Sequence, residues 1–285
     1  LDAARRWAKE RGFQAGVQTL RGVARAEEAG RAFSAVAEAA LAELWPVIEA
    51  EFARKHGPPP GRGAAVLAMG KLGSREMTAT SDLDLLIIYD PGDAEDSEGP
   101  KPLPVQTYYA RFAQAVIAAL SAPTAAGVLY PVDMRLRPSG RQGPVATRLS
   151  AFRAYQREQA WTWERMALTR ARGVAGAPDL LAEIEAAVAE ALSAPRDPAA
   201  TLADVRDMRR RVAEARARER ADPWSLKHAE GGMMDVEFAL QAGLLANGLT
   251  GAHAPREAVA RLRAAGWLDA AAAESLAEAH ALALS

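Results

Sequence analysis

Two aspartates separated by a single residue, Asp82 and Asp84, carry the strongest chemical signal in this chain. They stand at the start of an apolar run, and side chains two residues apart on a strand project from the same face. Two carboxylates held side by side repel each other unless a cation lies between them. Magnesium prefers carboxylate oxygens, retained waters and substrate phosphates as ligands. The pair therefore predicts a Mg²⁺ site.

A third aspartate extends this site. Asp133 is followed at two-residue steps by Arg135 and Arg137, and in an extended strand the three side chains share one face. Three carboxylates can hold two metal ions, which together stabilise the attacking and the leaving oxygen in a displacement at phosphorus. Arginines beside a metal site are expected when triphosphate charge also enters it. These residue types therefore predict the transfer of a nucleotidyl group.

A glycine-bearing segment precedes the aspartates. Gly70, Lys71, Gly73 and Ser74 follow the apolar run 64–69 and are predicted to form a turn. Glycine lets a backbone approach phosphate closely, amides in such turns bind anions, and a lysine adds a positive charge. A lone Asp-x-Asp or Gly-x-x-Gly has little specificity, whereas this ordered set of motifs is highly specific. The segment lacks the spacing of a Walker loop, which excludes that class of phosphate site.

Apolar patterning predicts the elements that hold these residues. Residues 64–69 and 83–89 are continuous apolar runs, which suit strands buried on both faces. Residues 127–136 are a third strand candidate. Apolar residues at three- and four-residue steps predict helices over 32–53 and 107–121. The glycine segment and the aspartates therefore lie at the ends of predicted strands.

Local signals also predict where helices begin and break. Pro46 is expected to kink or restart the helix that contains it. From Ser150 onward nearly all of the sequence is predicted to be helical. Ser150 is the predicted N-cap of one helix and Thr201 of another, and a double glycine precedes a further helix over about 235–246.

These elements predict an α+β fold in three parts. A helical arm is expected over 1–56, a small α/β sheet domain over 57–149 and a helical bundle domain over 150–285. The first boundary follows from the proline- and glycine-rich run 57–61, which cannot continue a helix.

Composition narrows the class of protein. The 285 residues carry 35 basic and 36 acidic side chains, a net charge of -1, which argues against a protein that coats nucleic acid. The chain has no cysteine, which excludes a disulfide framework and Cys-ligated zinc. No apolar stretch reaches the ~18 to 20 residues of a membrane helix, and residues 1–21 lack a signal-peptide core. We expect a cytoplasmic protein without nucleic-acid or membrane partners, cut from a longer chain.

The ordered motifs resemble the nucleotidyltransferase superfamily of DNA polymerase β type. Its hallmark is a glycine turn, an Asp-x-Asp strand and a later third aspartate, so the resemblance implies a polymerase β-like nucleotidyltransferase sheet. Within that superfamily the chain closely resembles the glutamine synthetase adenylyltransferase family. Three family-specific stretches within about residues 65–240 carry this resemblance: Gly70–Gly73 with Ser81–Leu85; Asp133–Gly140 with Tyr155–Gln156, Ala160–Glu164 and Arg170–Arg172; and Lys227–Phe238.

The resemblance implies a mechanism and a set of site residues. Asp82, Asp84 and Asp133 would be the catalytic residues that bind two Mg²⁺ ions and ATP. A tyrosine hydroxyl of glutamine synthetase would attack the α-phosphorus, pyrophosphate would leave, and Asp133 is a candidate acceptor of the tyrosine proton. The nucleotide-binding residues would be Gly70, Lys71, Gly73, Ser74, Ser81, Arg135 and Arg137.

The family has two related halves, one that attaches AMP to glutamine synthetase and one that removes it. Residues 138–140, 160–164 and 234–237 resemble the adenylylating half, although Arg165 stands where a histidine is expected. That half inactivates glutamine synthetase and so regulates nitrogen assimilation, and the family also implies a PII-type signalling protein as partner. Two alternatives stay open: the deadenylylating, phosphorolytic half, and a non-catalytic docking or regulatory module.

Several residues within these stretches have simpler interpretations. Trp161 and Trp163 are predicted to be core anchors rather than platforms for a base. Asp235 and Glu237 are predicted to stabilise the dipole at the start of a helix. The basic cluster 206–211 is predicted to be a solvated face.

Overall fold

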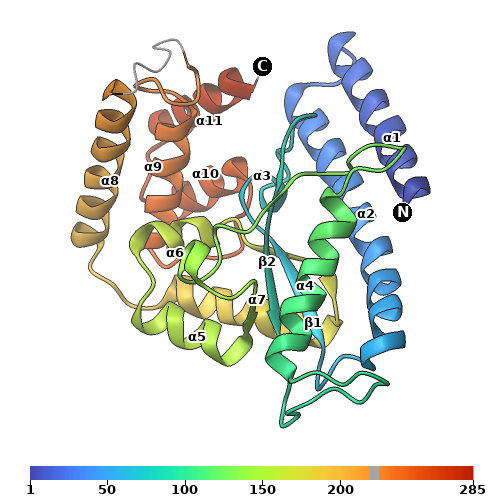
Figure 1. Ribbon diagram of the computed structural model, residues 1–285. Coiled ribbons are helices and arrows are strands. Elements are labelled where there is room, and N and C mark those ends of the chain that lie inside the picture. The colour runs from blue at the N-terminus through green and yellow to red at the C-terminus, as the bar shows by residue number, and fades with distance from the viewer. Residues whose placement is uncertain (219–224, 285) are drawn as a thin grey trace. The chain divides into compact units, whose positions relative to one another are not determined.

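The first part of the structure is organised around an antiparallel strand pair, β1 (Ala64–Ala68) and β2 (Leu83–Tyr89) (Figure 1). The computed structural model describes residues 1–218 and 225–284. Within these residues five strands form one sheet in the order β3-β2-β1-β5, with β4 also paired to β2. Parallel to β2 run β3 (Val132–Asp133) and β4 (Ala146–Arg148), and antiparallel to β1 runs β5 (Arg172–Gly176). The predicted α+β class is confirmed.

Both faces of the central strand pair are buried, as the continuous apolar runs predict. Val66 and Ile87 are 0% exposed on one face, and Leu67 and Ile88 are 0% exposed on the other. Burial of both faces favours apolar side chains at successive positions, and Asp84, near the start of β2, is the polar exception. The two predicted strands are confirmed at nearly their predicted bounds.

Two helices build the core on one face of this sheet, α2 (Ala26–His56) and α4 (Val105–Ser121) (Figure 1). Trp45 of α2 meets Phe112 of α4 edge to face, with ring centroids 5.0 Å apart. Such aromatic pairs add to the free energy of burial. The predicted helix over 107–121 is confirmed.

Helix α2 runs through Pro46 without interruption, so the prediction of a restart there is wrong. A proline inside a helix removes one backbone hydrogen bond. Leu44 before it and Ile48 after it are both buried in the same core, so packing keeps the two parts in one helix. The preceding helix, α1 (Asp2–Leu20), is tied to the end of α4 by Arg5, whose Nη2 donates to the Ala119 and Ala122 carbonyls at 2.8 and 2.9 Å.

The third strand is much shorter than predicted. Only Val132 and Asp133 pair with β2, whereas the prediction covered 127–136. After them the chain turns, because the Arg137 amide donates to the Met134 carbonyl. Alternation between faces therefore ends at Asp133, and the predicted common strand face for the aspartate and the two arginines is wrong.

Contacts divide the chain into two compact units. The first contains Leu1–Gln159 and Ala171–Ala187, and the second contains Ala160–Arg170 and Val188–Ser285. The sheet strand β5 lies in a region predicted to be helical, so that part of the prediction is wrong. The three predicted domains stay a prediction.

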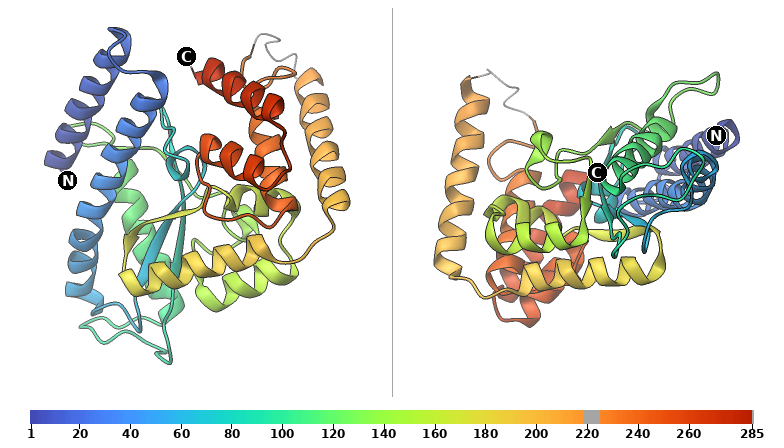
Figure 2. Two further views of the ribbon diagram at one scale, coloured as in Figure 1. Left: turned by 180° about the vertical axis from the view of Figure 1, so that it is seen from behind. Right: turned by 60° about the horizontal axis from the view of Figure 1, so that its bottom comes forward.

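The second unit is helical, and α9, α10 and α11 pack together around a small apolar core (Figure 2). Two predicted caps are wrong: Ser150 lies inside α5, whose N-cap is Arg148, and Thr201 lies inside α8, where the Ala199 amide donates to Asp197 Oδ1 instead. The predicted helix over 235–246 is confirmed.

No helix of the described residues is long and apolar enough to cross a membrane. The remaining elements are α3 (Gly70–Gly73), η1 (Gly140–Gln142), α5 (Leu149–Glu158), α6 (Thr162–Leu168), α7 (Pro178–Ser193), α8 (Pro198–Arg218), α9 (Met233–Ala246), α10 (Pro255–Ala264) and α11 (Ala270–Leu284).

Candidate metal centre

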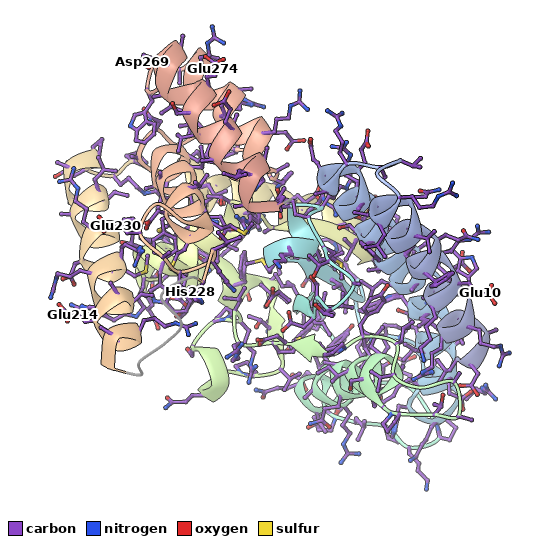
Figure 3. All side chains as sticks on the ribbon, turned by 90° about the horizontal axis from the view of Figure 1, so that it is seen from above. Glu10, Glu214, His228, Glu230, Asp269 and Glu274 are labelled. Carbon is purple, nitrogen blue, oxygen red and sulfur yellow. The ribbon has the colours of Figure 1, made fainter. Side chains whose placement is uncertain are left out.

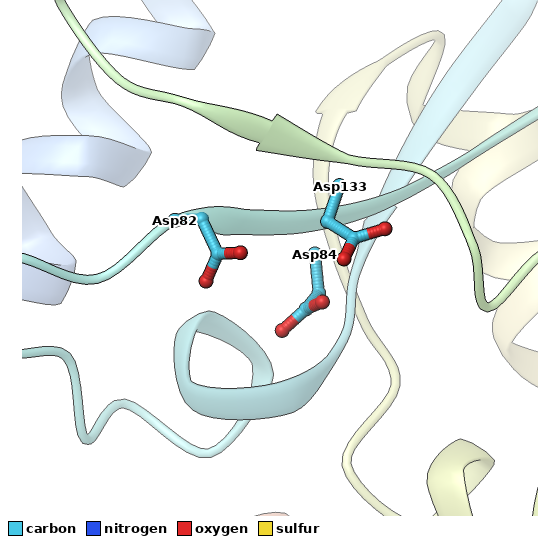
Figure 4. A group of neighbouring side chains, drawn as sticks. All are labelled: Asp82, Asp84 and Asp133. Atoms are coloured by element: carbon cyan, nitrogen blue, oxygen red, sulfur yellow. The ribbon is translucent and has the colours of Figure 1, made fainter.

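Three aspartates converge at the start of β2. Asp82, Asp84 and Asp133 each offer a carboxylate oxygen within 4.8 Å of the other two (Figure 4). Asp82 is exposed, and Asp84 and Asp133 are partly buried. The structure therefore brings together the three residues that the sequence predicts for one site.

Strand pairing places the third aspartate. The parallel register of β2 and β3 sets Leu83 beside Val132 and Asp84 beside Asp133. The Leu83 amide donates to the Pro131 carbonyl at 2.9 Å, which holds the two strand starts together. Register partners in neighbouring strands project from the same face about 5 Å apart, so their carboxylates meet.

The backbone of Gly70 packs against the carboxylate of Asp84. A Cβ atom added at Gly70 would lie 2.1 Å from Asp84 Oδ2, which is far inside van der Waals contact. The φ angle of Gly70 is +50°, in the left-handed region that favours glycine. Both observations make glycine the residue that fits between α3 and the aspartate.

The predicted glycine turn is one turn of helix, α3. The amide of Gly73 donates to the Met69 carbonyl at 2.9 Å, and the amide of Ser74 donates to the Gly70 carbonyl at 3.1 Å. The Ser74 hydroxyl donates to the same Gly70 carbonyl at 3.2 Å, and Ser74 is 1% exposed. The amides of Gly73 and Ser74 and the Ser74 hydroxyl therefore donate to carbonyls of the turn itself. An anion bound at α3 would contact the amides at the start of the turn instead.

The two predicted arginines have different surroundings. Arg135 donates to both oxygens of Asp133, from its amide to Oδ1 at 2.8 Å and from Nε to Oδ2 at 2.6 Å. These hydrogen bonds raise the pKa of Arg135. Arg137 donates from Nη1 to the Met134 carbonyl at 2.7 Å and from Nε to the Gly143 carbonyl at 3.0 Å. Arg135 therefore belongs to the aspartate cluster, while Arg137 shapes the loop that follows it.

Two further predicted residues flank the cluster. Ser81 Oγ accepts a hydrogen bond from the Thr78 amide at 2.9 Å and closes the turn before Asp82. Lys71 is partly exposed on α3. A contact between either side chain and a nucleotide stays a prediction.

The chemistry of this donor set fits a divalent cation. Three carboxylates gather at one point, and the Arg135 guanidinium pairs with one of them, that of Asp133. Carboxylate oxygens are hard donors of the kind that Mg²⁺ prefers, and the exposed Asp82 leaves room for waters or substrate oxygens. Asp82, Asp84 and Asp133 are the residues that could hold the metal.

The comparison with protein families bears directly on this geometry. The family model described as glutamate-ammonia ligase adenylyltransferase matches residues 1–217, which include all three aspartates. The chain belongs to the glutamate-ammonia ligase adenylyltransferase family.

Curated relatives are similar to this family member over most of its length. The bifunctional glutamine synthetase adenylyltransferase/adenylyl-removing enzyme of Mesorhizobium japonicum is 47% identical over 291 residues, covering 100% of this chain and 29% of the relative. The enzyme of the same name from Brucella suis is 50% identical over 247 residues, covering 86% of this chain and 25% of the relative. The chain therefore spans between a quarter and a third of the length of these two enzymes.

In this member of the adenylyltransferase family, two acidic residues of the third family stretch, Asp235 and Glu237, are paired within the helical unit. Arg209 donates to both oxygens of Asp235, and the Gly231 amide donates to Asp235 Oδ2 at 2.7 Å. Glu237 pairs with the buried Arg170 at 3.0 Å. Each carboxylate thus has a specific partner, and only Asp235 lies in the first turn of α9, where it also stabilises the helix dipole.

The same unit contains a histidine whose state is set by its neighbours. Figure 3 shows His228 and Glu230 in the segment that precedes α9, and Glu214 on α8. Burial and then the charge of Arg216 lower the pKa of His228. Arg216, whose guanidinium can only donate, forms a hydrogen bond to His228 Nε2. His228 therefore joins α8 to the segment that leads into α9.

The two tryptophans of the second family stretch are exposed, so their prediction as core anchors is wrong. Trp161 is 70% exposed and Trp163 is 41% exposed. The start of α6 is held instead by Glu164, which is buried and accepts a hydrogen bond from the Trp161 amide at 2.9 Å. Thr162 Oγ1 also donates to Asp204 Oδ2 at 2.7 Å.

Replacing Asp235 with asparagine should lower the free energy of unfolding at pH 7 by about 1–3 kcal/mol, the usual contribution of a charged hydrogen bond. The hydrogen bond from Arg209 lowers the pKa of Asp235 below its ordinary value of 3.8. Stability from this carboxylate is therefore present above pH 3.8 and is lost as the pH falls through the folded pKa. Urea unfolding at several pH values measures this.

The difference between the Asp235→Asn variant and the parent chain should shrink between pH 5 and pH 3. Glu214→Gln is the control, because Glu214 pairs with Arg210 at the surface and is 45% exposed. Its effect should stay below about 0.5 kcal/mol. A difference for Asp235→Asn that is equal at pH 7 and pH 3 would contradict the assignment of its effect to the ion pair.

Proposed function

We propose that this chain transfers AMP from ATP to a tyrosine of glutamine synthetase in a Mg²⁺-dependent reaction. The transfer inactivates glutamine synthetase and so regulates nitrogen assimilation. The observation that carries the proposal is the convergence of Asp82, Asp84 and Asp133 in a chain of this family. It is supported by relatives that are named as glutamine synthetase adenylyltransferases.

Each side chain of the cluster has a proposed role in this reaction. Asp82, Asp84 and Asp133 hold Mg²⁺, two ions in the full site, and the metal when bound neutralises triphosphate charge and orients the α-phosphate for in-line attack. Arg135 is 63% exposed, so its long side chain can move from Asp133 to the phosphates. Asp133 is the candidate acceptor for the proton of the attacking tyrosine hydroxyl.

Label transfer from ATP tests the proposal. The chain is incubated with glutamine synthetase, Mg²⁺ and ATP labelled either at the α- or at the γ-phosphate. We expect α-label on a tyrosine of glutamine synthetase and γ-label only in pyrophosphate. Transfer of γ-label to protein, or no transfer although the chain binds Mg-ATP, would contradict nucleotidyl transfer by this chain.

A second candidate is the reverse activity, because the relatives are named as bifunctional and adenylyl-removing as well. Adenylylated glutamine synthetase and inorganic phosphate are added to the chain, and release of ADP is measured. ADP release without label transfer in the first assay would favour this deadenylylating half. Failure of the chain to bind Mg-ATP in a titration would favour a non-catalytic docking or regulatory module.

Two further elements of the proposal come from the family. We propose a PII-type signalling protein as the regulatory partner and the cytoplasm as the location, since that is where nitrogen assimilation takes place. Co-purification of the chain with a PII-type signalling protein, with and without ATP, tests the proposed regulatory partner.

A further inference from the structure

A partly buried arginine at the start of β5, Arg172, holds the end of α3. Arg172 donates from Nε to the Gly73 carbonyl at 3.3 Å and from Nη2 to the Leu72 carbonyl at 3.1 Å. The same Nη2 forms an ion pair with Glu38 of α2 at 2.5 Å. The Arg172 side chain is 14% exposed and that of Glu38 is 23% exposed. One guanidinium thus joins three segments that are far apart in sequence.

Helix α3 depends on such outside support. It has four residues, and a single helical turn is not stable by itself, because nucleation fixes several residues for one hydrogen bond. The last carbonyls of any helix also lack partners within the helix. Arg172 supplies donors to two of these carbonyls, and its own backbone is held in the sheet by register pairing with Ala68 of β1.

The position of α3 decides the surroundings of Asp84. The backbone of Gly70, the first residue of α3, lies so close to Asp84 Oδ2 that a single added carbon would stand 2.1 Å from that oxygen. The Met69 amide, just before α3, donates to the Asp84 carbonyl at 2.8 Å. A shift of α3 would therefore change the room around the Asp84 carboxylate and so the direction in which it points.

We propose that Arg172, oriented by Glu38, is a positioning residue for the metal and nucleotide site. It acts through α3: by holding the Leu72 and Gly73 carbonyls it fixes the Gly70 backbone against Asp84. The inference rests on the proposed function of the aspartate cluster.

The arrangement requires the shape of arginine and not just its charge. The planar guanidinium presents its donors in a fixed fork, and here that fork reaches Glu38 and two carbonyls at once. A lysine offers one compact ammonium group, whose donors all start from a single atom and do not match acceptors spaced for a fork. Lysine at this position should therefore restore only part of the function.

Four variants test this role: Arg172→Met, Arg172→Lys, Glu38→Gln and, as matched control, Arg75→Met. Arg75 also binds Glu38, at 3.3 Å, but it is 55% exposed. Binding of Mn²⁺ with ATP is measured by electron paramagnetic resonance, hydrogen exchange is followed over residues 69–76, and kcat and KM for ATP are determined for label transfer.

We expect Arg172→Met to weaken Mn²⁺-ATP binding and to raise KM for ATP by about 10- to 100-fold, the usual effect of a misplaced site. Exchange over residues 69–76 should accelerate while β2 stays protected. Arg172→Lys and Glu38→Gln should lie between this variant and the parent chain, and Arg75→Met should stay within about twofold of the parent.

Faster exchange in α3 together with parental Mn²⁺-ATP affinity would overturn the inference, because Arg172 would then only stabilise the fold. If Arg172→Met does not fold, parental affinity in both Arg172→Lys and Glu38→Gln overturns it equally. Absence of Mn²⁺-ATP binding in the parent chain would overturn the proposed function and this inference with it. If the parent chain binds Mn²⁺-ATP and Arg172→Met binds it equally well, only the inference about Arg172 is overturned and the proposed function stands.

Discussion

Replacing Asp84 with asparagine should reduce label transfer to glutamine synthetase by about a thousandfold. The amide keeps the shape of the carboxylate but removes the negative charge that a Mg²⁺ ligand supplies. Loss of metal-based charge stabilisation costs several kcal/mol, and each 1.36 kcal/mol is tenfold in rate. The structure places Asp84 in the cluster beside both Asp82 and Asp133, so this residue should have the largest effect of the three. The rate is measured with α-labelled ATP at saturating Mg²⁺.

The thermal stability of the Asp84→Asn variant separates loss of chemistry from loss of fold. In metal-free buffer its Tm should equal or exceed that of the parent, because one of three mutually repelling carboxylates is neutralised. Mg-ATP should raise the Tm of the parent but not that of the variant, as expected when a ligand binds only the folded parent. A variant that keeps full activity would refute the metal assignment.

Asp90→Asn is the matched control, because Asp90 directly follows β2 at the end away from the cluster. It pairs with Arg62 at 3.0 Å. Its label transfer should stay within about twofold of the parent, since partly exposed ion pairs contribute little. An equal loss in both variants would show that any charge change near β2 disrupts the protein.

Replacing Gly70 with alanine should lower Mg²⁺-dependent activity by about a hundredfold or more. The added methyl group would lie 2.1 Å from Asp84 Oδ2, so either the carboxylate or α3 must move. A displacement of about 1 Å at a reacting centre costs roughly a hundredfold in rate. The left-handed φ of +50° adds a backbone cost of about 1–2 kcal/mol. Activity and Mn²⁺ affinity measure the first effect, and urea unfolding measures the second.

Gly92→Ala separates these two effects. Gly92 has a φ of +55°, nearly the same as Gly70, but an added Cβ there meets no heavy atom of the described residues within 4 Å. It should show the backbone cost of about 1–2 kcal/mol with unchanged metal affinity. If both glycine variants lose activity equally, the contact between Gly70 and Asp84 is not the cause.

Sequence patterns predicted those elements whose signal is contained in a few consecutive residues. The strand pair is visible because burial on both faces favours an unbroken apolar run, as in residues 85–89 of β2. Helix α4 is visible because its buried residues recur at helical spacing. The Asp82 and Asp84 spacing predicts adjacent carboxylates for the same reason, since a strand alternates its faces every residue.

The errors lie where tertiary packing overrides a local signal. The strand predicted over 127–136 keeps two residues, because pairing with β2 ends where the chain turns at Met134. Pro46 sits within one helix because core residues surround it on both sides. Strand β5 lacks an apolar run, having Arg172, Gly173 and Gly176 among its five residues, so only pairing with β1 identifies it as a strand.

The sequence by itself determined the chemical types of the site, two of its aspartates at the start of one strand, and a resemblance that the family match confirmed. Tertiary structure alone decided three points: that Asp133 meets Asp84 through parallel register, that Gly70 packs on Asp84, and that Arg172 holds α3. The physical reason is the sequence separation of the residues that interact. Side-chain periodicity is a property of a few consecutive residues, whereas strand register and a guanidinium that joins three segments depend on contacts across the chain.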